Sequence, residues 1–112
     1  NSEEALATLH SWAKAWSSKD VKTYLNSYAS DFQTPKGESR KEWAEERRTR
    51  IESKGRINVQ IEAAQVAVEN NTATIKFRQT YKSDKLSSTS HKTIVMVKQG
   101  GRWLIKQERS AS

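Results

Sequence analysis

The sequence predicts an α+β domain in which three N-terminal helices pack on a strongly curved, antiparallel four-stranded sheet. Apolar residues follow a helical spacing as far as residue 54, and from Arg56 onward they alternate every second residue, as in strands. The alternation changes phase at Ala63–Ala64, which indicates a β-bulge of the kind that bends a sheet. At 112 residues the chain is long enough for one domain with one hydrophobic core.

The first helix is predicted to begin at Ser2, a good N-cap, with Glu3 and Glu4 in the first turn, where the helix dipole favours acidic groups. The polar segment of residues 17–20 ends it. The apolar stripe of this helix has the three- and four-residue spacing of an amphipathic helix and comprises Leu6, Leu9, Trp12, Ala13 and Trp16.

A second, shorter helix is predicted from near Asp20, and Phe32 is expected to fill the same core beyond its end. Pro35 and Gly37 mark the loop that follows. The apolar face of this second helix comprises Val21, Tyr24, Leu25 and Tyr28.

The third helix is predicted to begin at Ser39, because Ser39 and Glu42 have the spacing of a capping box. Gly55 is expected to end it. Most of its side chains are charged, so we expect a surface helix anchored mainly by Trp43.

The second half of the chain predicts four strands joined by hairpins. Asn70–Asn71 and Gly100–Gly101 have the composition of two-residue turns, and the polar stretch Asp84–Ser90 that of a longer hairpin loop. The predicted strands are Ile57–Val68, Ala73–Ser83, Thr93–Val97 and Arg102–Glu108.

The strand at residues 73–81, ATIKFRQTY, is the centre of the predicted sheet. It alternates strictly, which indicates one buried face and one solvated face. Gln79 lies between Phe77 and Tyr81 on the face that should be buried. A buried amide needs hydrogen-bond partners, so Gln79 and Tyr81 belong either to a ligand pocket or to a satisfied core network.

Composition excludes several classes of protein. The chain has no cysteine, so disulfides, thiolate metal sites and a cysteine nucleophile are excluded. Only 34% of the residues are hydrophobic, which leaves no room for a membrane span. Four Trp, three Tyr and two Phe argue against disorder.

The net charge of +7 is concentrated beyond residue 35. Residues 1–35 carry three basic and four acidic groups, residues 36–60 eight and five, and residues 61–112 nine and four. This distribution favours an anionic partner near the third helix and the strands. The alternative is a solvated surface that keeps the domain soluble.

A family resemblance covers nearly the whole chain. The run WAKAWSSKDVKTYLNSYASDF, the segment FRQTYKS and the ending KTIVMVKQGGRWLIKQE resemble nuclear transport factor 2-like (SnoaL-like) domains. The pattern is most similar to the C-terminal accessory domain of bacterial envelope proteins of the L,D-transpeptidase-like (YkuD) and tetratricopeptide-containing kinds. We therefore expect residues 1–112 to be a single domain of this superfamily, excised from a longer protein, since the chain starts at Asn1.

The resemblance implies a cone-shaped α+β barrel whose helices and curved sheet enclose a mostly apolar pocket with a few polar groups. Enzymes of the superfamily such as ketosteroid isomerase place a catalytic carboxylate in the loop after the second helix. Here that loop has the sequence QTPKGES, which departs from the pattern, so no catalytic residue is predicted. The candidate ligand-binding residues are Tyr28, Trp43, Arg47, Gln79, Tyr81, His91 and Trp103.

Other chemistry has little support in the sequence. His10 and His91 are far apart and there is no cysteine, so no metal site and no cofactor are predicted. Gly100–Gly101 closes a hairpin and does not form a phosphate loop. Arg47 and its neighbouring arginines suit an acidic ligand, although a solvated helix face interlaced with Glu is the more ordinary interpretation.

The leading hypothesis is a non-catalytic accessory domain of a bacterial cell-envelope protein, periplasmic or at the envelope, with the cytoplasm as the alternative location. Its pocket and basic face would meet a small-molecule or cell-wall-derived ligand, or a neighbouring protein domain. The alternatives are a small-molecule isomerase or dehydratase, and a nucleic-acid or polyanion binder, the last disfavoured by the absence of a recognition motif. A homodimer stays open, because members of the superfamily often dimerise through the sheet.

Overall fold

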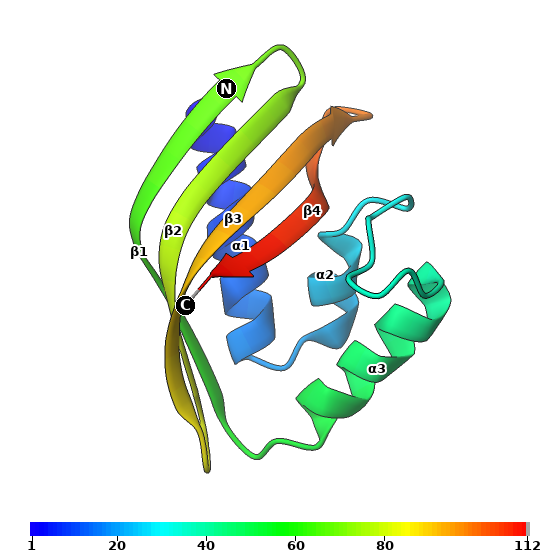
Figure 1. The fold of residues 1–112 in the computed structure, drawn as a ribbon, viewed down its shortest axis with the longest axis vertical. Helices are drawn as coiled ribbons and strands as arrows, with labels where there is room; N and C mark the ends of the chain where they lie inside the picture. Colours follow the sequence, from blue (N-terminus) through cyan, green and yellow to red (C-terminus); the bar gives the residue numbers. More distant parts are fainter. Residues whose placement is uncertain (112) are drawn as a thin grey trace.

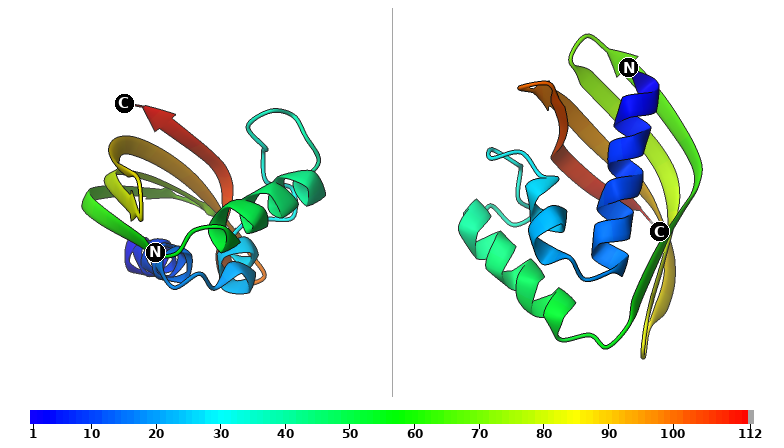
Figure 2. Two further views of the ribbon diagram at one scale, coloured as in Figure 1. Left: turned by 90° about the horizontal axis from the view of Figure 1, so that it is seen from below. Right: turned by 180° about the vertical axis from the view of Figure 1, so that it is seen from behind.

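The computed structural model describes residues 1–111 as three helices packed on one four-stranded antiparallel sheet (Figure 1). The strands follow one another in sequence order across the sheet, and α1 lies along one face (Figure 2). The predicted α+β fold is confirmed. The elements are α1 (Ser2–Ser17), α2 (Val21–Asn26), α3 (Arg40–Glu52), β1 (Ile57–Glu69), β2 (Thr72–Ser83), β3 (Ser87–Gln99) and β4 (Arg102–Ala111).

Two irregularities bend the sheet around the helices. In β1 the pairing with β2 shifts between Glu62 and Gln65, and Ala63 has a φ of 55°. This confirms the bulge predicted at Ala63–Ala64. In β4, Lys106 stands unpaired between Ile105 and Gln107, where the register with β3 shifts. Each bulge turns the following side chains to the other face. In β1 this keeps Val66 on the concave side, and in β4 it turns Glu108 to that side.

The hairpins differ in one place from the prediction. Asn70 has a φ of 57°, and Gly100 and Gly101 have φ values of 58° and 79°, as tight two-residue turns require. The loop predicted over Asp84–Ser90 is wrong, because β3 already begins at Ser87. The serines and threonines of this stretch pair with β2 through their backbone groups. Their polar composition is typical of a loop and gave no sign of a strand.

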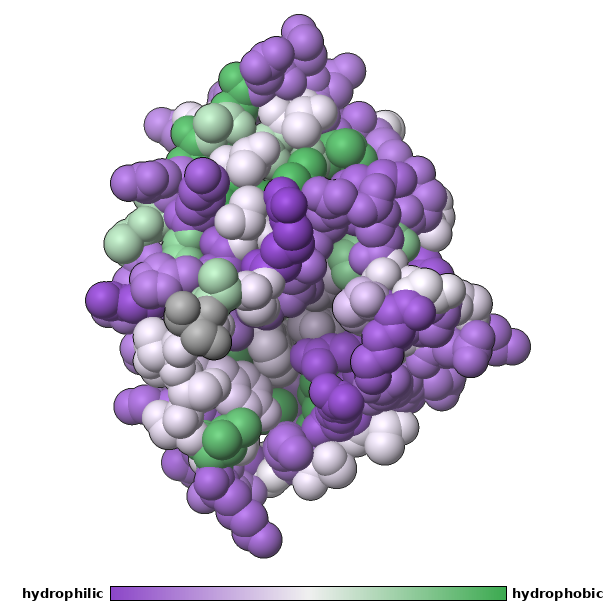
Figure 3. Space-filling model, viewed as in Figure 1, coloured by the Kyte–Doolittle hydropathy of each residue, from purple (hydrophilic) through white to green (hydrophobic). Residues whose placement is uncertain are grey.

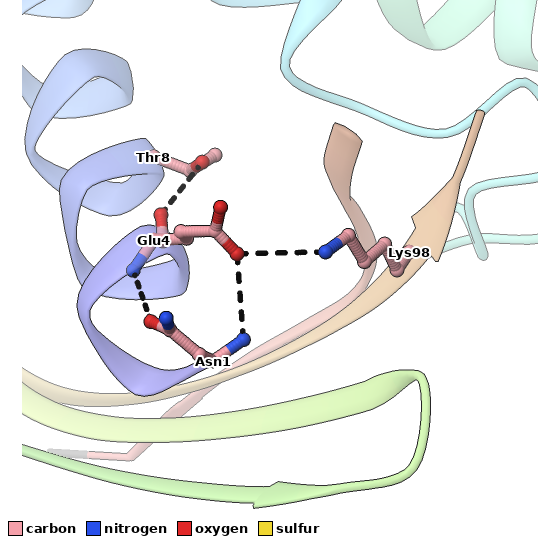
Figure 4. A network of polar contacts seen from close by, with 4 residues as sticks. All are labelled: Asn1, Glu4, Thr8 and Lys98. Atoms are coloured by element: carbon pink, nitrogen blue, oxygen red, sulfur yellow. Dashed lines mark hydrogen bonds and ion pairs between the residues drawn. The ribbon is translucent and has the colours of Figure 1, made fainter. Parts of the chain in front are cut away.

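The N-cap of the first helix lies one residue earlier than predicted. Asn1, not Ser2, is the N-cap: its side chain accepts a hydrogen bond from the backbone N–H of Glu4, and the Glu4 carboxylate faces the terminal ammonium (Figure 4). Lys98 at the end of β3 lies 3.4 Å from the same carboxylate. The start of α1 is therefore fixed to the edge of the β3–β4 turn.

The third helix begins as predicted, with Ser39 accepting a hydrogen bond from the backbone N–H of Glu42. Its end was predicted wrongly, because the C-cap is Ser53 and not Gly55. Gly55 is instead approached by Asp84, whose carboxylate accepts hydrogen bonds of 3.1 Å from the backbone N–H groups of Gly55 and Arg56. These bonds join the end of α3 to the tip of the β2–β3 hairpin.

The core lies between the concave face of the sheet and the helices. Trp12 and Leu9 of α1 are fully buried, and rings from all three helices contact one another beside them. The sheet supplies the other side of this core through Ala73, Ile75, Phe77, Ile94, Met96, Trp103 and Ile105.

We predict that Gly55→Ala destabilises the domain by about 1 kcal/mol in chemical denaturation, the order of one or two lost hydrogen bonds at a surface site. A Cβ at this position would lie 2.2 Å from Asp84 Oδ2, so the carboxylate would have to leave its two backbone donors. In an Asp84→Ala background the same substitution should cost almost nothing. Equal costs in the two backgrounds would contradict this role of Asp84.

Candidate functional site

A buried ion pair occupies the centre of the concave face. Lys92 of β3 donates to Glu108 Oε2 of β4, and their side chains are only 8% and 19% exposed. The Lys92 ammonium lies 5.5 Å from the ring centroid of Trp12 and 5.4 Å from that of Trp16. Two aromatic faces and one carboxylate thus replace the water that this cation loses.

A chain of hydroxyls links this ion pair to the helices. The Tyr28 hydroxyl donates to Glu108 Oε1 at 2.7 Å and accepts from Trp12 Nε1 at 3.0 Å. The hydroxyl oxygens of Tyr24 and Tyr28 are 3.2 Å apart, and Arg47 Nε donates to Tyr24 at 3.1 Å. One network therefore connects all three helices to β3 and β4.

The network holds Glu108 ionised. Burial alone would raise the pKa of the Glu108 carboxyl, but the Lys92 ammonium and the Tyr28 hydroxyl outweigh it and hold this pKa below its usual value. Burial, followed by the nearby Glu108 charge, raises the pKa of Tyr28 well above its usual value. Both carboxylate oxygens of Glu108 are occupied, so this group is a poor general base.

A pocket opens beside this network, between α3 and the inner face of β2. The surface is hollowed between the sheet and α3 (Figure 3), and the cavity has a volume of about 360 Å³. Trp16 and Tyr81 form an aromatic wall, with ring centroids 5.4 Å apart. The complete lining is Trp16, Arg47, Arg50, Ile51, Lys54, Ile57, Gln79, Tyr81, Leu86 and Ser88.

Two groups in this lining have unused hydrogen-bonding capacity. Gln79 is 5% exposed, and its Oε1 has no partner among the described residues 1–111. The Arg47 guanidinium lies over the Trp16 ring at 5.3 Å and uses only Nε, toward Tyr24. No carboxylate in the described part of the chain forms an ion pair with Arg47, whereas Arg50 at the rim pairs with Glu46 at 2.9 Å.

A second hollow of about 420 Å³ lies on the other side of the Arg47 side chain. Trp43 and Phe32 form its apolar wall, and Tyr24 and Glu108 reach it from the buried network. Arg47 lines both hollows, so its guanidinium stands at the boundary between the pocket and the ion pair.

The structure brings three of the predicted site residues, Arg47, Gln79 and Tyr81, into one pocket. Tyr28 and Trp43 are buried beside it, 3% and 5% exposed, with ring centroids 4.6 Å apart. The Tyr28 hydroxyl hydrogen-bonds Glu108, and the Trp43 ring packs against the Tyr28 ring.

Two predicted residues lie elsewhere. His91 is exposed on the convex face, because it pairs with Arg78, whose side chain points away from the helices. Trp103 is at the opposite end of β4 from Glu108, about 17 Å along the strand, and its ring lies near Lys98. The expected convergence of His91 and Trp103 on the pocket is wrong.

Four important residues were missing from the prediction: Trp16, Tyr24, Lys92 and Glu108. Lys92 has a signal in the sequence, since it shares the alternation of the buried Ile94 and Met96. Glu108 has none, because the unpaired Lys106 reverses the alternation after Ile105 and moves Glu108 from the expected outer face to the inner one. Trp16 and Tyr24 were assigned only to the hydrophobic core.

The fold and the site define an α+β cone with a partly charged pocket, the architecture of nuclear transport factor 2-like domains. A family model confirms this: residues 4–109 match the Cds6 C-terminal NTF2-like domain, and the chain belongs to that family.

Solved structures share the fold. The Bdellovibrio bacteriovorus protein Bd1075 is 28% identical with a TM-score of 0.84, over 92% of this chain and 37% of that protein. The helical cell shape determining protein Pgp2 from Campylobacter jejuni is 21% identical with a TM-score of 0.79, over 93% and 39% of the two chains. An NTF2-like protein of unknown function from Pseudomonas putida is 14% identical with a TM-score of 0.86, over 99% and 85%.

The chain thus spans less than two fifths of the Bdellovibrio and Campylobacter proteins. None of the curated proteins compared with the sequence matches it significantly. Within the described residues, no helix combines the length and apolar character needed to cross a membrane.

We predict that Lys92→Met destabilises the domain by about 3 kcal/mol, because it leaves the Glu108 carboxylate buried and unpaired. The double variant Lys92→Met/Glu108→Gln should recover most of this loss, since a neutral amide still accepts from Tyr28 and needs no counter-charge. Urea denaturation of both variants provides the measurement. Equal destabilisation of the single and double variants would show that the unpaired Glu108 carboxylate does not cause the loss of stability.

Acid should weaken the fold through the same carboxyl. The pKa of Glu108 is lower in the folded than in the unfolded state, so its contribution is present above the unfolded pKa, about 4.3, and is lost as pH falls through the folded pKa. The unfolding free energy of the wild type should therefore fall more steeply between about pH 5 and pH 3 than that of Glu108→Gln. Parallel curves would contradict the lowered pKa.

Proposed function

We propose that this domain is a non-catalytic binding module of a bacterial cell-envelope protein, with a small pocket and a basic face presented to a ligand or partner. Its pocket is suited to a small, cell-wall-derived ligand that carries an anionic group. The supporting observation is that the free Arg47 guanidinium and the unsatisfied Gln79 Oε1 line the same cavity.

The chemistry of the lining supports an amphipathic anion. It contains three basic side chains, Arg47, Arg50 and Lys54, and no acidic one. Arginine offers a planar fork that matches a carboxylate, and Gln79 Oε1 can accept from an N–H or O–H of the same ligand. Trp16 and Tyr81 provide an apolar wall for its body. A short peptide with a free carboxylate has all three features.

The state of Glu108 supports the absence of catalysis. A general base needs an available lone pair and a pKa close to the working pH. Glu108 meets these needs poorly, because each of its oxygens already accepts a hydrogen bond, from Lys92 or Tyr28, and its pKa is held low.

A structural relative supports the proposed location in the envelope. The chain matches a C-terminal domain family, and a structural relative is described as a determinant of helical cell shape. Because this chain spans well under half of that relative, we propose that it is one domain of a longer envelope protein, similar to the accessory domains of L,D-transpeptidase-like proteins.

A second candidate function is turnover of a small molecule, as in isomerases or dehydratases of the same fold. The buried row formed by Tyr24, Tyr28 and Glu108 favours it, since hydroxyls beside a carboxylate can exchange protons. This candidate requires Lys92 to release Glu108 when substrate binds.

We predict that a muramyl tripeptide with free carboxylates binds the domain and that Arg47→Met weakens its affinity at least tenfold, as for the loss of a charge-assisted hydrogen bond. Isothermal titration calorimetry measures the affinity. Arg48→Met, on the same helix but paired with Glu52 on the surface, is the matched control and should bind like the wild type.

Two results would contradict the proposal. One is unchanged binding by the Arg47 variant, which would place the ligand elsewhere. The other is conversion of the ligand during the titration with loss of that conversion in Glu108→Gln, which would support the enzymatic alternative.

A further inference from the structure

The convex face of the sheet carries a second, separate groove. It has a volume of about 750 Å³ and crosses all four strands on the side away from the helices. Four basic side chains, all exposed, point out of this groove and are called the convex basic cluster: Lys76, Arg78, His91 and Arg109.

The strand register places these four groups in two adjacent rows. Lys76 and Arg109 lie in one row, on either side of Thr93, and Arg78 faces His91 in the next. Neighbouring strands are about 4.8 Å apart and same-face residues along a strand about 7 Å apart, so the cluster is dense.

Acidic groups do little to balance this charge. Glu62 of β1 pairs with Arg78 at 3.3 Å, and both side chains are about half exposed, at 47% and 48%. No acidic residue lines the groove. An exposed ion pair of this kind contributes little, so Arg78 can exchange Glu62 for another anion.

The groove also limits what kind of anion fits. Its only aromatic lining residue, Phe77, is 3% exposed and packs into the core on the other face. Nucleic-acid bases are normally bound by stacking on exposed rings, which this surface does not offer. The remaining lining consists largely of short side chains such as Thr74, Thr93 and Ala63, which leave the basic groups accessible.

We infer that the convex basic cluster binds an extended phosphodiester or polyphosphate chain through its phosphates, independently of the pocket. Lys76 and Arg109 supply two separated charges along the chain, and the arginines match phosphate oxygens with their planar forks. This inference gives the basic face of the proposed module a location and a ligand class, and it stands or falls separately from the pocket.

The test uses long-chain inorganic polyphosphate as the probe and fluorescence anisotropy at several salt concentrations. The double variant Lys76→Gln/Arg109→Gln should bind at least tenfold more weakly at low salt. The slope of log affinity against log salt should fall by roughly 0.7 for each lost contact. The control Lys41→Gln/Arg48→Gln removes the same charge from positions of α3 outside the pocket and should change binding less than threefold.

Several outcomes would overturn the inference. Equal weakening by both double variants would mean attraction by net charge alone. Tighter binding of oligo(dT) than of polyphosphate would mean recognition of bases, and equal binding of polyglutamate would mean no preference for phosphate. Light scattering that reveals a dimer, dissociated by Lys76→Gln/Arg109→Gln, would assign this face to a second copy of the chain. The muramyl tripeptide titration of Lys76→Gln/Arg109→Gln should stay unchanged, which separates this site from the pocket.

Discussion

The ion pair between Lys92 and Glu108 is the constraint on which the rest of the structure depends. Two charges in a largely dry core are tolerated only if each is paired and the remaining hydrogen-bonding capacity is satisfied. Tyr28 of the segment after α2 and the rings of Trp12 and Trp16 on α1 meet this demand. The helices are therefore positioned by a polar requirement as well as by apolar packing.

The same network determines which polar groups of the pocket remain available to a ligand. Both oxygens of Glu108 accept hydrogen bonds, and Arg47 donates to Tyr24 through Nε alone, so its other N–H groups remain available where it lines the cavity. Gln79 adds an acceptor that the fold leaves unpaired. A pocket whose described lining contains no carboxylate, and whose free groups are a cation and an amide, is suited to binding rather than to proton transfer.

The sequence was sufficient for the fold because periodicity records which side of each element is buried. The bulge at Ala63–Ala64 and the cap at Ser39 were both readable, since each leaves a local signature. The end of α3 was not, because Gly55 owes its place to Asp84, a contact 29 residues away. Asn1 was overlooked as a cap beside the equally suitable Ser2.

The site was less predictable, for a physical reason. Glu108 joins the site only through the register of β4, and the unpaired Lys106 that sets this register has no signature in composition. Glu108 therefore could not be assigned to the core. His91 could have been excluded, because the alternation from Ile94 back to Lys92 already turns it outward. Gln79 and Tyr81 were found because a polar residue within an otherwise apolar pattern is visible locally, whereas Arg47 was named because an arginine of this helix suits an acidic ligand.

The most direct test of this account is the titration of the Glu108 carboxyl, followed by ¹³C NMR in the folded protein. The account predicts a single transition with a pKa below that of an ordinary glutamate, with the carboxyl fully ionised at neutral pH. A pKa raised toward neutrality would mean that Lys92 does not hold the carboxylate. Glu108 would then be available for proton transfer, and the domain would have to be reconsidered as an enzyme.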